Sequence, residues 1–236
     1  MESLFLFREK QGMDFDELRD YSNTLEELLE SKFKKFNQVL EKRAKKVPQE
    51  ELEDFYSDHY YDRLIEGMSS GYELNYRYPD LLRKSVFTTC YAFFELELTN
   101  YCKFIKTKNN IELALFDLKH EGITKAQVFL KKVAGIAFPD SKIDWSNIIN
   151  YNRIRNSIMH NNGFISDNPK DKTAGAVRNF IKENPRIISV DAENQVELSR
   201  GFSMEFLKTT ESFLHELYGP TAFKAVSLFD RDIFNE

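Results

Sequence analysis

Helix-breaking residues are scarce in this sequence, because 236 residues include only nine glycines and six prolines. Long helices are therefore favoured. Cysteine is scarcer still, with Cys90 and Cys102 falling in one apolar stretch. Two cysteines are too few for a disulfide scaffold, and twelve residues apart they do not make a zinc site. We expect reduced thiols and a cytoplasmic protein.

Long apolar runs are also lacking. The segment Leu4-Phe5-Leu6-Phe7 is too short for the core of a signal peptide, and no later run approaches membrane-spanning length. The sequence has no phosphate-binding glycine loop, no nucleophile elbow and no dinucleotide-binding fingerprint. Its four histidines show no metal-ligand spacing. We expect no cofactor, no metal and no membrane partner.

Basic charge is not in excess, since the formal net charge is −5. The overall field of the molecule therefore does not attract nucleic acid, and RNA binding has to use a local patch. The best candidate is Lys32–Lys46, with seven basic residues and one acidic residue, although such a run is ordinarily a solvated helix face. Aromatic residues are abundant, with 21 Phe and 11 Tyr, and they predict an aromatic-rich core.

Apolar residues recur at helical spacing along most of the chain, which predicts an all-α protein. The strongest pattern begins at Pro79 and continues to about Lys106. Other helices are expected at residues 14–46, 49–68, 111–118, 124–135, 141–161, 174–183 and 202–218, with more helix beyond Pro220. The turn-like Asp191-Ala192-Glu193-Asn194 predicts a small β-hairpin. We divide the chain into an N-terminal helical extension, residues 1–73, and a helical domain, residues 74–236.

One helix, expected over residues 141–161, carries the side chains with chemical potential. Asn152, Asn156 and His160 are spaced i, i+4, i+8 and line one face, with Arg155 beside them. RNA cleavage without metal needs a histidine that moves protons near neutral pH and an arginine that stabilises phosphate charge. His160 and Arg155 supply these two groups, and the side-chain amide of Asn156 can orient either of them.

Arg155 and His160 lie about 140° apart around an ideal helix, so their side chains converge poorly within one chain. A two-fold dimer that pairs this face with its copy would assemble two Arg/His sets in one cleft. In the ordinary structural alternative, His160 interacts favourably with the helix dipole and Arg155 pairs with a neighbouring carboxylate. Residue spacing alone leaves both interpretations open.

The segment Arg155-Asn156-Ser157-Ile158-Met159-His160 resembles the R-x(4–6)-H motif of the HEPN superfamily, whose arginine is commonly followed by a polar residue. The resemblance covers roughly Tyr76–Tyr218. It extends to a long preceding helix with an acidic residue in its apolar run, Phe93-Phe94-Glu95-Leu96, and to a hairpin followed by a closing helix. Residues 1–73 have no counterpart in it.

This resemblance implies a HEPN-like helical bundle that forms a homodimer, with both motifs in one cleft. It implies metal-independent endoribonuclease activity on an RNA substrate, of the kind found in toxin–antitoxin and antiviral defence systems. Arg155 and His160 inherit the catalytic roles and Asn156 the supporting one. A cognate antitoxin or regulatory protein is then a further partner.

Some members of the superfamily are inactive, so a fold of this kind does not guarantee the reaction. The alternative function is therefore a catalytically inactive helical dimer that binds RNA or a partner protein. Glu95 has two interpretations. It either pairs with Arg155 or holds His160 in place, or it is a partly solvated residue at the flank of the buried face.

Overall fold

Helices account for nearly all of the regular structure in residues 4–62 and 69–219, the part of the chain that this computed structural model describes. They are α1 (Leu4–Ala44), α2 (Leu52–Tyr60), α3 (Tyr78–Lys108), α4 (Gly122–Val128), α5 (Ile143–Asn161), α6 (Lys172–Glu183) and α7 (Phe202–Tyr218). Strands β1 (Ile188–Val190) and β2 (Val196–Leu198) pair as an antiparallel hairpin. The predicted all-α fold with a small hairpin is thus confirmed.

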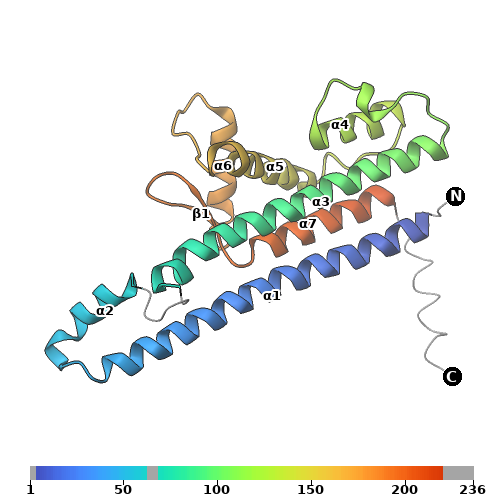
Figure 1. Cartoon of the computed structure of the whole chain (residues 1–236). Helices are drawn as coiled ribbons and strands as arrows, with labels where there is room; N and C mark the ends of the chain where they lie inside the picture. Colours follow the sequence, from blue (N-terminus) through green and yellow to red (C-terminus); the bar gives the residue numbers. More distant parts are fainter. Residues whose placement is uncertain (1–3, 63–68, 220–236) are drawn as a thin grey trace, which may run out of the picture.

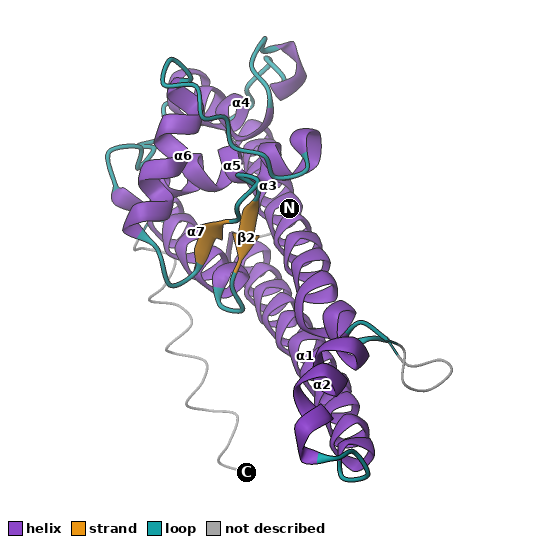
Figure 2. Cartoon of the chain, turned by 90° about the vertical axis from the view of Figure 1, so that its left-hand side faces the viewer, coloured by secondary structure: helices purple, strands orange, loops and turns teal. Residues whose placement is uncertain are grey.

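Helices α1, α3 and α7 lie side by side along the molecule, with α1 antiparallel to the other two (Figure 1). Helices α5 and α6 lie across the opposite side of α3 from α1, and α4 lies near the C-terminal end of α3. Figure 2 shows the hairpin at the side of the bundle and the α1–α2 end projecting away from it. The α5 region and the α1–α2 end are therefore well separated.

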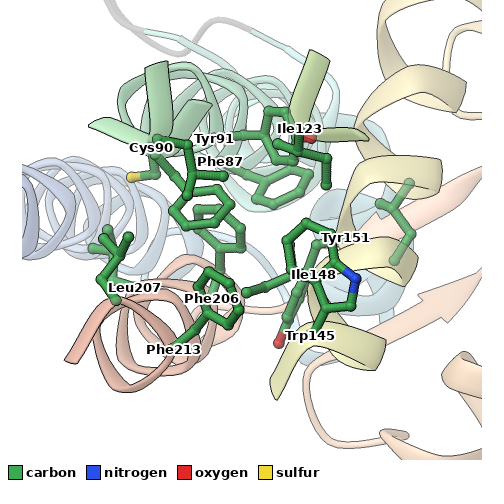
Figure 3. Close-up of a cluster of buried hydrophobic side chains, with 14 of the residues drawn as sticks. Phe87, Cys90, Tyr91, Ile123, Trp145, Ile148, Tyr151, Phe206, Leu207 and Phe213 are labelled. Carbon is green, nitrogen blue, oxygen red and sulfur yellow. The ribbon is translucent and has the colours of Figure 1, made fainter. Parts of the chain in front are cut away.

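An aromatic core forms where α3, α5 and α7 cross (Figure 3). The ring of Phe206 on α7 lies 5.3 Å from that of Phe87 and 5.8 Å from that of Tyr91, both on α3. Tyr151 of α5 lies 5.1 Å from the same phenylalanine ring. All four side chains are buried. Edge-to-face and offset ring pairs at these separations stabilise the fold beyond the burial of their area.

The first half of α1 shares this core. Phe15 is fully buried in the main cluster and meets the ring of Phe93 edge-on at 5.2 Å. Arg83 of α3 donates two hydrogen bonds to the buried Glu26 carboxylate of α1, from Nε at 2.7 Å and from Nη2 at 3.0 Å. Removing Arg83 would leave the buried Glu26 carboxylate unpaired, so this bidentate pair holds α1 firmly against α3.

The second half of α1 packs with α2 around a small separate cluster of Phe36, Leu40 and Leu74. The long helix therefore belongs partly to the main core and partly to the α1–α2 end. Our boundary at residue 73 stays a prediction.

One expected helix is absent. Residues 111–118 contain only a 3₁₀ turn, Leu115–Asp117. The Lys106 ammonium donates to the backbone oxygens of Ile111 and Glu112, at 2.7 and 2.8 Å. In a helix, these carbonyl oxygens would accept hydrogen bonds from backbone N–H groups four residues further along the chain. Because they accept from a side chain instead, the segment is held as a loop against the end of α3.

Two helices begin earlier than the sequence predicts. Helix α1 starts at Leu4 rather than near residue 14, and a π-helical turn, Glu73–Arg77, precedes α3. The Ser70 amide donates to Glu73 Oε2 at 2.8 Å, and the Glu73 amide donates to Ser70 Oγ at 3.1 Å. This reciprocal capping box starts the helix well before Pro79, the residue that we expected to open it.

Helices α4, α5, α6 and α7 and the hairpin lie within a few residues of their predicted positions. Helix α2 ends at Tyr60, whereas we expected it to continue to residue 68. Residues 63–68, and the helix expected beyond Pro220, lie outside the described residues. None of the described helices is both long enough and apolar enough to cross a membrane.

The two cysteines of α3 provide a test of its packing. Burial raises the pKa of the Cys90 and Cys102 thiols to about 12. The thiolate is the reactive form, so both side chains stay protonated and shielded at mildly alkaline pH. We expect a thiol-specific reagent to leave the native protein unlabelled while labelling both thiols rapidly in denaturant. Rapid labelling of either thiol in the native protein would contradict the buried face of α3.

Candidate functional site

Helix α5 presents the predicted site residues, and its apolar side fixes which way they face. Tyr151 and Ile154 are fully buried against the neighbouring helices. On the other side, Asn156 and His160 are exposed and Asn152 is half-buried. The Asn156 amide donates to Asn152 Oδ1, one turn earlier, at 3.4 Å. The polar row that the sequence predicts is therefore present.

Arg155 lies at the edge of the aromatic core. Its guanidinium carbon is 5.4 Å from the centroid of the Tyr91 ring, within the range of a cation–π contact. Its Nη1 donates to Asn156 Oδ1 at 2.9 Å. Within the described residues, no carboxylate forms an ion pair with Arg155. The half-buried side chain is held in place while its charge is left for an anion.

Tyr91 lies between an acidic and a basic group. Burial is the main cause that raises the pKa of its hydroxyl, and Glu95, one turn further along α3, adds a smaller rise. Arg155 lowers the pKa and so opposes both. The phenol is therefore protonated throughout the physiological range. Tyr91 was missed by the sequence analysis, because its position in the apolar stripe of α3 is that of an ordinary core residue.

Glu95 is half-buried and faces the start of α4. Its Oε1 lies 2.8 Å from the point that a Cβ on Gly122 would occupy, and Gly122 has a φ of +53°. A glycine at this position thus leaves room for the carboxylate. Among the described residues, neither an ion pair nor a hydrogen bond joins the Glu95 carboxylate to Arg155 or His160. Its placement matches the partly solvated alternative.

His160 lies in the last turn of α5, and its imidazole forms no hydrogen bond with the described residues. Asn162 and Gly163 follow in left-handed conformations, with φ values of 53° and 82°. The Gly163 amide donates to the Ser157 carbonyl oxygen at 3.0 Å, and its own carbonyl accepts from the Val196 amide at 2.9 Å. These residues form the predicted helix cap and tie the end of α5 to the hairpin.

The structure brings Arg155 and Asn156 together but does not bring His160 to them. The two predicted catalytic side chains lie about 140° apart on an ideal helix, and no described contact joins them. A single chain therefore presents an arginine and a histidine on neighbouring parts of one helix surface, with no closed Arg/His pair. The shared cleft of a two-fold dimer stays a prediction.

The basic run Lys32–Lys46 lies away from this surface. All seven of its basic residues are exposed, but they belong to the half of α1 that packs with α2, far from α5 (Figure 1). Within residues 4–62 and 69–219, no group of three His, Cys, Asp or Glu side chains is placed to hold a metal ion.

Comparison of the chain with protein-family models, with curated proteins and with solved structures gave no match. The HEPN resemblance therefore rests on the sequence alone, on the motif and on the residues around it.

A stability measurement separates the two interpretations of Arg155. We expect Arg155→Ala to lower the free energy of unfolding by about 1 kcal/mol or less, because it removes one partly exposed ring contact and one hydrogen bond. Arg153→Ala is the matched control, since Arg153 makes one hydrogen bond to Asn150 on the same helix, at 2.8 Å. Denaturant titration measures both. A loss of more than about 3 kcal/mol, as for a broken buried ion pair, would make Arg155 a structural residue.

Proposed function

We propose that the protein is a homodimeric, metal-independent endoribonuclease of the HEPN kind, acting in the cytoplasm as a toxin or antiviral defence effector. One observation carries the proposal. Arg155 is held by the Tyr91 ring and by Asn156, yet it has no carboxylate partner among the described residues. The structural alternative for this arginine depends on such a partner. An unpaired guanidinium held in one orientation is suited to phosphate.

The proposed reaction uses the 2′ hydroxyl of RNA as the nucleophile. One His160 takes the 2′ proton, and the freed oxygen attacks the adjacent phosphorus. The bond from phosphorus to the 5′ oxygen then breaks, and the same His160, now protonated, gives that oxygen its proton. Arg155 stabilises the charge on the non-bridging phosphate oxygens, and Asn156 orients it. The products are a 2′,3′-cyclic phosphate and a 5′ hydroxyl.

The exposed surface around the end of α5 supports a dimer. Met159 and Phe164 flank the polar row and are 55% and 46% exposed. Apolar side chains beside polar groups are typical of surfaces that become buried on association. An isologous interface at α5 would place Arg155 of one copy near His160 of the other, which the helix geometry prevents within a chain. A cognate antitoxin or regulatory protein would act by covering this surface.

Cleavage in the presence of EDTA tests the activity directly. We expect the purified protein to cut mixed RNA, leaving 2′,3′-cyclic phosphate ends. His160→Ala and Arg155→Ala should each lower the rate about a hundredfold or more, because they remove proton transfer and charge stabilisation. His120→Ala, at an exposed histidine outside α5, and Arg153→Ala should keep the wild-type rate.

Cleavage that survives both substitutions would remove the proposed site. If the wild-type protein binds RNA but does not cut it, the inactive helical dimer is the better description.

Mixing two inactive variants tests the shared cleft. If Arg155 and His160 come from different copies, each mixed dimer of Arg155→Ala with His160→Ala has one intact site. Random exchange makes half of the dimers mixed, so co-expressed variants should recover about a quarter of the wild-type rate. Each variant alone is the control. If the mixture cleaves RNA no faster than the two variants do separately, Arg155 and His160 of one site do not come from different copies.

A further inference from the structure

A pocket of about 350 Å³ is lined by residues from the C-terminal half of α3, from the loop before α4 and from α4. Figure 1 shows these elements together at one end of the bundle. The apolar side chains of Cys102, Leu115 and Phe129 line its interior. The volume is at the lower end of the range for ligand pockets, which suits a small planar group better than a peptide.

Three lysines surround the pocket, and they divide into two kinds. Lys106 is engaged with the backbone oxygens of Ile111 and Glu112, so it fixes the covering loop. Lys103 and Lys125 form no ion pair with any described residue. Their ammonium groups are left for an anion beside an apolar cavity.

The sequence around the pocket is basic although the whole chain is acidic. Residues 103–132 include seven lysines and three acidic residues, a formal charge of +4, against −5 for the whole molecule. This basic region lies at the C-terminal half of α3 and around α4, whereas the run Lys32–Lys46 lies at the α1–α2 end. A local field of this sign attracts phosphate in a way that the overall charge does not.

An exposed aromatic ring stands among the residues that line the pocket. Phe116 is 81% exposed, the highest value among the large hydrophobic side chains of the described residues. Burial of such a ring is favourable, and its exposure at a pocket is a cost that a stacked ligand would remove. Exposed rings with neighbouring cationic groups are how proteins stack bases while contacting the backbone of single-stranded RNA.

The pocket lies further along α3 than the contact with Arg155, on the side away from the end of α5, where Gly163 lies beside Lys84. Arg155 contacts the ring of Tyr91, and Thr99 lines the pocket eight residues further on, a rise of about 12 Å. Glu95 lies between these two positions, and its carbonyl oxygen accepts a hydrogen bond from the Thr99 hydroxyl at 2.9 Å. A few nucleotides of an extended strand cover this distance.

We propose that the pocket binds one nucleotide of the RNA that is cleaved at α5. The base stacks on Phe116 and enters the apolar cavity, and the phosphate lies between Lys103 and Lys125. This inference rests on the proposed ribonuclease function for the identity of the RNA. A free nucleotide offers the same chemistry, so the experiment compares both sources.

Binding is measured in the His160→Ala protein, which keeps the RNA intact, by fluorescence anisotropy with a short labelled single-stranded RNA. We expect Phe116→Ala to weaken binding about tenfold and Phe116→Trp to restore it, because the larger ring still stacks. Lys103→Gln combined with Lys125→Gln should lower the slope of log affinity against log salt by about 0.7, since the two lysines together neutralise one phosphate of a single strand.

Matched controls lie on α1. Lys32→Gln combined with Lys35→Gln removes the same charge from exposed positions far from the pocket, and it should leave the affinity within about twofold. Wild-type RNA affinity in both the Phe116→Ala and the double-lysine variants would overturn the proposal. Competition by adenosine, guanosine, cytidine and uridine monophosphates is measured with the same variants. If the pocket variants bind mononucleotides more weakly but bind RNA with wild-type affinity, the ligand is a free nucleotide. The proposal that the pocket binds the RNA substrate is then wrong.

Cleavage by the same pocket variants, with His160 intact, separates this inference from the proposed function. We expect a raised KM with kcat nearly unchanged, because the pocket binds substrate away from the reacting phosphate. A wild-type KM in these variants would contradict nucleotide binding in the pocket and leave the proposed ribonuclease activity unaffected. If the wild-type protein does not cleave RNA but binds it in a way that depends on the pocket, the binding site is supported and the ribonuclease activity is contradicted.

Discussion

The contact of Phe206 with the rings of Phe87, Tyr91 and Tyr151 is the constraint on which the rest of the structure depends. It joins α3, α5 and α7 at one crossing and thereby fixes the rotation of α5 about its axis. Once the buried side of α5 is set, its polar row has to face outward. Arg155 lies at the border of this contact, so the same rings that stabilise the bundle also orient the guanidinium. A change to the Tyr91 ring would therefore alter both the core and the orientation of Arg155.

The sequence predicts the parts of this fold that depend on local periodicity. The apolar stripe of α3, the extent of α5 and its cap at Asn162 and Gly163 all follow from residue spacing and from backbone preference. The errors occur where side chains bind the backbone. Lys106 holds the expected helix at residues 111–118 as a loop, and the capping box at Ser70 starts a helix ahead of Pro79. Contacts between a side chain and the backbone leave at most a short motif in the sequence, and the spacing of apolar residues does not reveal them.

The same division applies to the candidate site. The row of Asn152, Asn156 and His160 is a property of one helix, so its spacing predicts it. The contact of Arg155 with Tyr91 joins two helices, and nothing in the sequence around Tyr91 distinguishes it from other core residues. The basic pocket is likewise assembled from separate elements, and its lysines are too far apart in sequence to form a run. The run that the sequence does show, Lys32–Lys46, lies at the wrong end of the molecule for α5.

Arg155 has no carboxylate partner among the described residues, and this has a consequence for the proposed dimer. A two-fold axis through the α5 surface would bring two such arginines toward each other, and like charges at short range oppose association. RNA phosphates would offset this repulsion, with one phosphate held by each arginine. Dimer formation and RNA binding would then be linked, each strengthening the other by the same coupling free energy. The protein would then dimerise weakly without RNA and more strongly when RNA is bound. Its catalytic groups would stay apart until the substrate is present.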